Sequence, residues 1–186
     1  MKIEIEKPSD NDRAVIKKQC NNEIGDVYGI AARCPHGFPQ VVVLDPVRKN
    51  SKSGYSMNAL STLIWLTCPA MKRKIAELEE RGMIKKVEYL LSRDREMETM
   101  MTDAHANFYY FRKDIFSKLS GNGFTEEMIR VADSGVGGIK DVKTVKCLHL
   151  HYAHYKICPK NIVGRAVEGL IREQSYCGCE DSSCRT

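Results

Sequence analysis

The pattern of apolar and polar positions predicts a small sheet in the first third of the chain. Residues 9–20 begin with helix-capping residues and continue as a short helix. Two apolar, β-branched runs follow at 26–34 and 39–47, and the turn between them is rich in glycine and proline. They predict a hairpin with Cys34 at its tip. The apolar run at 60–67 predicts a third, buried strand that leads into Cys68.

Beyond Pro69 the apolar spacing changes to the period of a helix. Met71, Ile75 and Leu78 follow a proline suited to a first helical turn, and Gly82 ends this predicted helix. Later periodic segments predict helices around 87–91, from 97 to about 121, from Thr125 onward, over 145–157 and over 162–173. The predicted fold class is therefore α+β, with a small antiparallel sheet near the N-terminus followed by a mostly helical remainder.

Composition narrows the class of protein. The chain has 186 residues, of which 42% are hydrophobic and 28% charged, as expected for one globular domain with a buried core. We expect this domain to span residues 1–176 and residues 177–186 to form a polar, cysteine-rich tail. The charged N-terminus lacks the apolar core of a signal peptide, and the longest apolar stretch, 63–66, is too short to cross a bilayer. These features predict a cytoplasmic protein without a membrane partner.

The charge pattern favours an anionic ligand. The net charge of +5 is a mild excess and gives no clear nucleic-acid signal. Basic residues such as Lys143 and Lys146 flank the cysteines and histidines discussed below, where they would attract an anion or form a solvated face. The glycine-rich segment 134–138, SGVGG, resembles a backbone nest for an anion, but a flexible connection is the favoured interpretation.

Cysteine and histidine are concentrated in one short segment. Eight cysteines in a reducing compartment favour metal ligands or reactive thiols over disulfides, although buried cysteine also serves as a small apolar side chain. Residues 145–161, VKCLHLHYAHYKICPKN, hold three of the five histidines and two cysteines. On a continuous helix, one face would carry Cys147, His151, His154 and Cys158, with His149 on the opposite flank. This density favours a functional site.

The positions of three cysteines favour a site assembled by the fold. Cys34, Cys68 and Cys147 are lone residues at the ends of different predicted elements, unlike the close cysteine pairs of zinc fingers. The first two precede proline, which stiffens the turn that presents the thiol. Three thiolates with an open position suit either a catalytic zinc or an iron–sulfur cluster with one iron not held by cysteine.

The segments CPHGFPQVV, WLTCP, GGIKDVKTVKCLH and NIVG together resemble the bacterial family catalogued as domain of unknown function 501. The resemblance covers about residues 30–170. It implies that the family's characteristic polar set is Cys34, Cys68, Cys147, His149 and His154. His151, Cys158 and the C-terminal tail lie outside this pattern. If His149 is the functional residue, Cys147 sits in a turn before the helix, where helical spacing does not apply.

Three functions stay open at this point. In the first, Cys34, Cys68 and Cys147 hold a [4Fe-4S] cluster whose open iron acts on a small anionic substrate, with His149 or His154 as acid/base or exchangeable fourth ligand. In the second, the same cysteines bind zinc with a histidine, in a catalytic or structural site. In the third, the protein is a non-catalytic redox or partner-binding module. None of the three assigns metal to the tail cysteines Cys177, Cys179 and Cys184.

Overall fold

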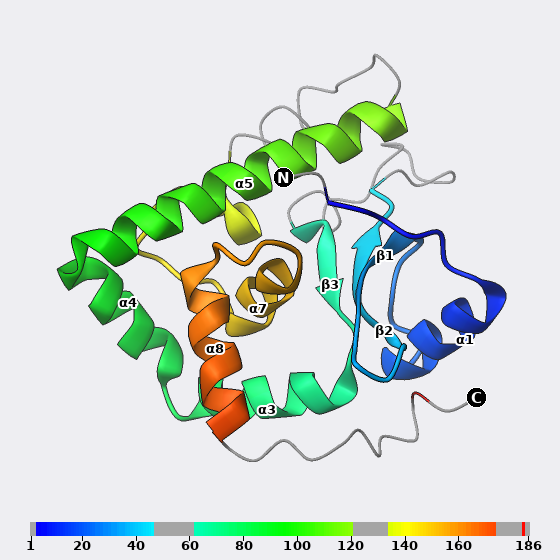
Figure 1. The fold of residues 1–186 in the computed structure, drawn as a ribbon, viewed down its shortest axis with the longest axis horizontal. Coiled ribbons are helices and arrows are strands. Elements are labelled where there is room, and N and C mark those ends of the chain that lie inside the picture. The colour runs from blue at the N-terminus through cyan, green and yellow to red at the C-terminus, as the bar shows by residue number, and fades with distance from the viewer. Residues whose placement is uncertain (1–2, 47–61, 121–133, 174–183, 185–186) are drawn as a thin grey trace.

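The computed structural model describes residues 3–46, 62–120, 134–173 and 184. Three antiparallel strands lie near the N-terminus and helices make up most of the rest, so the predicted α+β class is confirmed (Figure 1). The strands are β1 (Val27–Arg33), β2 (Pro39–Leu44) and β3 (Ile64–Leu66). The helices are α1 (Asp10–Gln19), α3 (Pro69–Glu80), α4 (Met83–Arg93), α5 (Arg95–Ser120), α7 (Leu148–Ile157) and α8 (Ile162–Glu173), and a short 3₁₀ turn, η1 (Val136–Gly138), precedes α7.

β2 is the central strand of the sheet, with β1 and β3 antiparallel on either side. The predicted hairpin is confirmed, because Arg33 pairs with Pro39 and the Cys34 N–H donates to the Phe38 carbonyl at 2.9 Å. Gly37 turns the chain with a φ of 83°, a left-handed conformation that glycine adopts without strain. Cys34 therefore lies in a tight, hydrogen-bonded turn.

β3 is shorter than the strand predicted over 60–67. Only Ile64–Leu66 pairs with β2, because Leu63 has a left-handed φ of 50° that breaks the extended run. Residues 60 and 61 lie outside the described residues. Ile64 and Leu66 are buried, whereas Trp65 between them is 41% exposed. The edge strand thus presents one large aromatic ring to its surroundings.

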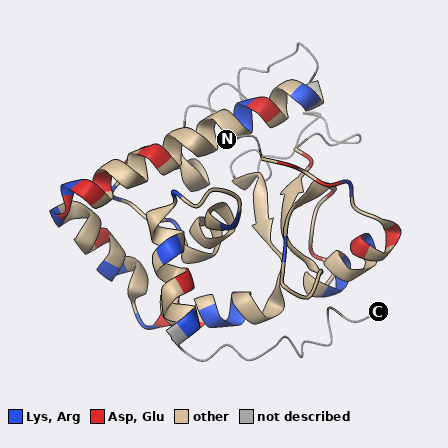
Figure 2. Ribbon diagram, in the orientation of Figure 1, with Lys and Arg blue, Asp and Glu red and all other residues tan. Residues whose placement is uncertain are grey.

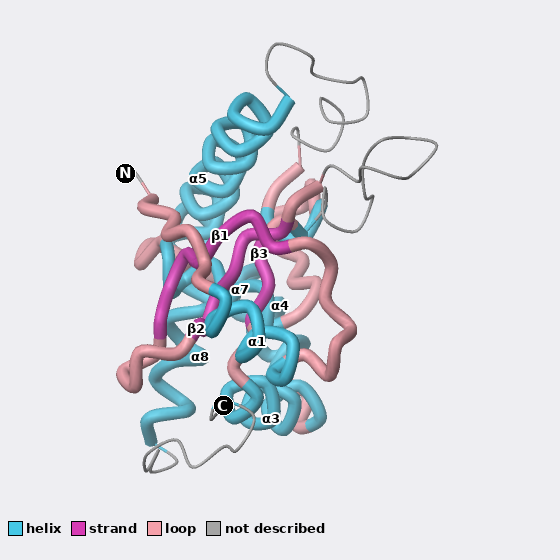
Figure 3. The backbone as a smooth tube through the Cα atoms, turned by 90° about the vertical axis from the view of Figure 1, so that its right-hand side faces the viewer, coloured by secondary structure: helices cyan, strands magenta, loops and turns pink. Residues whose placement is uncertain are grey.

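The sheet separates two apolar clusters of unequal size. On one face, Val42 of β2 and Ile30 of β1 pack with Ile16 of α1. On the other face, Val41 and Val43 join a large core built with the later helices. Figure 3 shows α1 on one side of the strands, with α5, α7 and α8 behind them. This alternation along β2 follows from the period of two in a strand.

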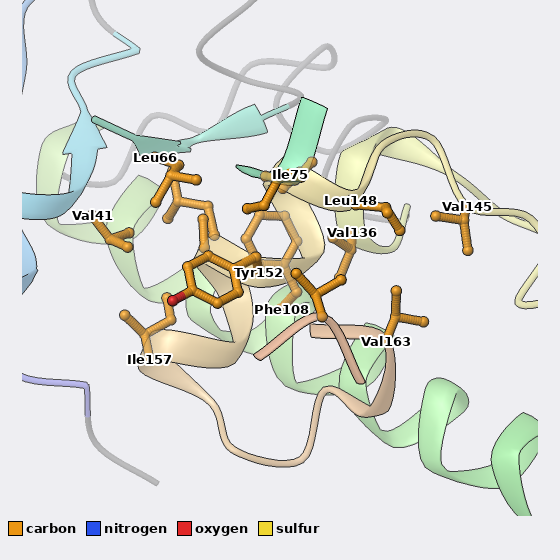
Figure 4. Packing of buried hydrophobic residues seen from close by; sticks show 14 of the residues in the cluster. Val41, Leu66, Ile75, Phe108, Val136, Val145, Leu148, Tyr152, Ile157 and Val163 are labelled. Atoms are coloured by element: carbon orange, nitrogen blue, oxygen red, sulfur yellow. The ribbon is translucent and has the colours of Figure 1, made fainter. Parts of the chain in front are cut away.

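α7 is the central helix of the larger core. It packs against α3, α8, β3 and η1, and Figure 1 shows these elements around it. Leu148, Tyr152 and Ile157 on α7 meet Ile75 of α3 and Phe108 of α5 (Figure 4). A helix that is apolar on almost every side is buried in the core. His151 and His154 of α7 are therefore buried as well.

The helix boundaries lie at proline, glycine and capping residues. α3 begins with Pro69 directly after Cys68 and ends before Gly82, whose φ is 77°. The Ser9 hydroxyl accepts from the backbone N–H of Asp12, and the Asp12 carboxylate accepts in return from the backbone N–H of Ser9. The helix predicted from Thr125 lies outside the described residues.

The outer faces carry both signs of charge. Figure 2 shows Lys and Arg interspersed with Asp and Glu along α1 and α5. Arg33 joins three parts of this surface, because it binds Glu6 at 2.7 Å and Asp12 at 2.8 Å while donating to the Gly37 carbonyl. Within the described ranges, no helix combines the length and apolarity that crossing a membrane requires.

Candidate functional site

The three predicted cysteine ligands lie at the ends of different elements. Cys34 opens the β1–β2 turn, Cys68 caps the start of α3, and Cys147 caps the start of α7. The sheet register brings the first two to the same end of the sheet, because Arg33 pairs with Pro39 and the Thr67 N–H donates to the Gln40 carbonyl at 2.9 Å. β2 lies between them.

The described residues do not include a formed metal site. No group of three or more His, Cys, Asp or Glu in this part of the chain is placed to hold one ion. The iron–sulfur cluster and the zinc ion therefore stay predictions. Of the tail cysteines, Cys177 and Cys179 lie outside the described residues. Cys184 is buried, and its sulfur accepts from the Gln19 side chain at 3.2 Å.

α7 begins at Leu148, three residues later than predicted. Cys147 has extended backbone angles, with φ −163° and ψ 149°, so it precedes the helix and does not share the face of His151 and His154. The structure thus agrees with the alternative in which Cys147 sits in a turn before the helix. The first N–H of α7, on Leu148, donates to a Glu79 carboxylate oxygen at 2.6 Å. A carboxylate at a helix N-terminus is electrostatically favourable.

His149 is held between α7 and α3. Its Nδ1 lies 3.2 Å from Glu79 Oε1, and its Nε2 lies 3.1 Å from the Lys72 carbonyl oxygen. Both partners are acceptors, so both contacts are hydrogen bonds only when both ring nitrogens carry protons. Both ring nitrogens therefore contact acceptors on α3. Glu79 could not be found from the sequence, since nothing in the local pattern distinguishes it from other charged residues of that helix.

Cys147 lies beside His149 as a half-buried thiol. Burial raises the pKa of the Cys147 thiol and the Glu79 carboxylate adds to the rise, while the backbone N–H groups of Leu150 and His149 and the Lys146 ammonium oppose it. The result is a thiol that stays protonated at neutral pH. A protonated thiol is a weak nucleophile and a weak metal ligand.

His151 and His154 are fully buried and share one partner, Asn161. The Asn161 Nδ2 donates to Nδ1 of both rings, at 3.2 Å and 2.9 Å, while its Oδ1 accepts from the Gly164 N–H. Since both Nδ1 atoms accept, the neutral rings carry their protons on Nε2, and His154 Nε2 lies 3.4 Å from the Asn107 Oδ1. Burial lowers the pKa of each imidazole to about 3. His154 therefore lies in the core and faces no open site.

The glycine-rich segment 134–138 is fixed by α5. The buried Arg112 donates to the carbonyls of Ser134 and Gly135 at 2.8 Å and 2.9 Å. The Val136 N–H donates to His105 Nδ1 at 2.8 Å, and a Cβ at Gly135 would overlap the His105 ring. The N–H groups of Gly135 and Gly138 also donate to backbone carbonyls. The segment is therefore an internally bonded loop, without a nest of free donors.

A pocket lies between β3 and the start of α7. Its cavity volume is about 270 Å³, and its apolar wall consists of Ile64, Trp65, Leu66 and Leu150. Its polar side consists of Lys72, Lys146, Cys147 and His149, with Thr62 at the margin. This volume is close to the lower end of the roughly 300–1,000 Å³ typical of small-molecule sites. Two sequence motifs about 80 residues apart, WLTCP and VKCLH, thus contribute to one pocket.

Two lysines, Lys72 and Lys146, line the pocket. Lys72 donates to the Gln19 carbonyl at 3.2 Å, and Lys146 donates to the Gly137 carbonyl at 3.3 Å. Carbonyl oxygens are neutral, so these contacts orient the ammonium groups without cancelling their charge. Lys146 was among the basic residues singled out from the sequence. Lys72 was missed, because only the packing of α3 against α7 brings it to the pocket.

Comparison with known proteins gives one match. The family model described as Protein of unknown function (DUF501) matches residues 30–169, which include both motifs of the pocket. Neither the curated proteins nor the solved structures contain a match. The matched region covers well over half of the 186 residues and agrees with the resemblance seen in the sequence. The chain therefore belongs to the DUF501 family.

Proposed function

We propose that this protein binds a small anionic molecule in the pocket between β3 and α7. One observation supports the proposal most strongly: residues from two distant family motifs surround a single cavity that also holds Lys72 and Lys146. Concave, mostly apolar sites with a few polar groups are typical of ligand-binding sites. The positive charges of the two lysines that line this site favour a ligand with negative charge.

The surroundings of Cys147 support binding over covalent chemistry. The thiol is protonated at neutral pH, as its raised pKa indicates. The neighbouring His149 directs its two ring nitrogens at Glu79 and at the Lys72 carbonyl, so it is not positioned to accept the thiol proton. The residues of the pocket therefore favour a reversible complex.

Trp65 provides a direct test, because it is the only tryptophan in the chain and lies in the pocket wall. Titration with octanoate should give a saturable blue shift of its emission, since ligand would cover a ring that is now 41% exposed. Cys147→Phe, which fills part of the cavity, should abolish the shift. Cys147→Ser, which keeps the size of the side chain, should retain it. An equal response from the Phe variant would show that octanoate binds elsewhere.

The metal-binding function stays a second proposal. The observation that favours it is the placement of Cys34 and Cys68 at one end of the sheet, each followed by a proline. With Cys147 they would hold a [4Fe-4S] cluster, or zinc as the alternative, and a bound cluster would supply a Lewis-acidic iron for the anionic substrate. A cytoplasmic location, which belongs to this proposal, suits such thiol ligands because thiols stay reduced there.

Elemental analysis of anaerobically purified protein tests the second proposal. A cluster should give brown protein with absorbance near about 400 nm, whereas colourless protein with stoichiometric zinc would indicate the zinc alternative. Single changes of Cys34, Cys68 or Cys147 to Ser should remove the metal, and the same change at Cys177 or Cys179 should not. Metal-free protein with full helicity would contradict both metal assignments.

A further inference from the structure

The polar side of the pocket has few free hydrogen-bond donors. At the start of α7, the Leu148 N–H donates to Glu79, while the N–H groups of His149 and Leu150 lie close enough to Cys147 to lower the pKa of its thiol without forming a capping hydrogen bond. In the loop that contacts Lys146, the Val136 N–H donates to His105. The Leu148 donor of α7 and the Val136 donor of the loop are therefore already used, which leaves fewer backbone N–H groups for an anion than an open helix N-terminus or nest offers.

The number of hydrogen-bond donors at the pocket bears on whether it binds a phosphate or a carboxylate. A phosphate group presents three oxygens and is usually bound by several backbone N–H groups together with a basic side chain. A carboxylate presents two oxygens and needs fewer donors. Of the side chains that line the pocket, Lys72, Lys146 and Trp65 carry further N–H donors. They match a carboxylate better than a phosphate.

The wall of the pocket defines the rest of the ligand. Ile64, Leu66 and Leu150 are aliphatic, and the exposed Trp65 ring adds a flat apolar surface. Burying apolar ligand surface against such a wall contributes about 25 cal/mol per Å². A cavity of about 270 Å³ accommodates a short chain or a single ring, in addition to the head group.

Resting on the proposed function, we infer that the ligand is an apolar monocarboxylate, such as a short fatty acid or an arylalkanoic acid. Its body lies along Trp65 and its carboxylate meets Lys146. The Lys146 ammonium is anchored at the Gly137 carbonyl, and Gly137 belongs to the loop that Arg112 holds through Ser134. Lys146, which would bind the carboxylate, is thereby linked through this loop to Arg112 of α5.

A series of octyl compounds at concentrations below micelle formation tests the inference, with Trp65 emission as the signal. Octanoate should bind about fivefold more tightly than octanol, the ratio typical of one partly exposed ion pair, and more tightly than octyl phosphate or octylamine. Lys146→Ala should lower octanoate affinity to that of octanol and leave octanol affinity unchanged. Lys143→Ala is the matched control, because Lys143 pairs with Glu98 outside the pocket.

The outcomes distinguish the inference from the proposed function. Tighter binding of octyl phosphate than of octanoate, or unchanged octanoate selectivity in Lys146→Ala, would overturn the carboxylate assignment while leaving an anion-binding pocket. If no octyl compound gives a signal that Cys147→Phe removes, the proposed function fails, and the inference fails with it. Circular dichroism at 222 nm checks that each variant is folded, as 222 nm is about the wavelength of the helix signal.

Discussion

The protein should lose about 4 kcal/mol of its free energy of unfolding between pH 7 and pH 5. His151 and His154 are fully buried as neutral rings, and burial lowers the pKa of each to about 3. In the unfolded chain a histidine has a pKa of about 6.5, so at pH 5 the unfolded state binds protons that the folded state does not. Each ring then contributes a loss of about 2 kcal/mol.

The protein becomes less stable as the pH falls because burial lowers the pKa of both histidines in the folded state. Because the folded-state pKa is depressed, the stabilisation is present above the unfolded pKa of about 6.5 and is lost as the pH falls toward 3. The pKa values of the carboxyl groups of Asp12 and Glu168 are lowered by hydrogen bonds to their partners. For these acids the stabilisation is lost only below a pH of about 4. The interval from pH 7 to pH 5 therefore reports mainly on the buried histidines, and His105, whose pKa burial also lowers, adds to the loss from His151 and His154.

Urea unfolding followed by circular dichroism at pH 7, 6 and 5 measures this effect. His154→Asn, in which the amide oxygen replaces the Nδ1 acceptor, should reduce the pH-dependent loss by about 2 kcal/mol. His36→Ala is the control, because His36 is exposed on the hairpin turn and the loss should stay at its original size. A stability that does not change between pH 7 and pH 5 would show that the two rings are not buried as neutral groups.

Replacing Gly164 by Ala should destabilise the protein by about 2 kcal/mol or more, the usual cost of overpacking a tight contact. A Cβ at this position would overlap the His151 carbonyl oxygen and the Tyr155 Cβ, so α8 would have to move away from α7. That movement would also strain the Gly164 N–H bond to Asn161, which holds both buried histidines. Differential scanning calorimetry measures the loss.

Gly169 provides a matched control in the same helix. It is exposed, and a Cβ there would meet nothing within 4 Å. Gly169→Ala should therefore stabilise the protein by about 0.5–1 kcal/mol through higher helix propensity. Equal effects of the two substitutions would contradict the close approach of α7 and α8.

Local patterns predicted most elements of the fold. The β-branched run of β2, the Gly37 turn and Pro69 at the start of α3 are each recognisable from a few neighbouring residues, and each lies where expected. β3 was predicted too long, because the left-handed backbone of Leu63 leaves no mark in the apolar pattern. Helical spacing placed His151 and His154 on one face, and they share Asn161 in the structure.

The site was harder to predict, because it depends on contacts between distant segments. Helical spacing was applied to Cys147, which precedes α7, so its predicted alignment with His154 was wrong. Glu79 and Lys72 contact His149 across about 70 residues of sequence, and no local pattern links them. Trp65, Cys147 and His149, which belong to the motifs, line the pocket, but the sequence did not indicate that they face one cavity.

The most direct test of the central claim is the ¹⁹F NMR spectrum of protein labelled with 5-fluorotryptophan. Since the chain contains one tryptophan, the spectrum reports on Trp65 alone, in the wall of the pocket. We predict that octanoate shifts this single resonance in a saturable way and that Cys147→Phe removes the shift. A resonance that stays unchanged with octanoate, octanol and octyl phosphate, each up to its micelle limit, would contradict a ligand-binding pocket between β3 and α7.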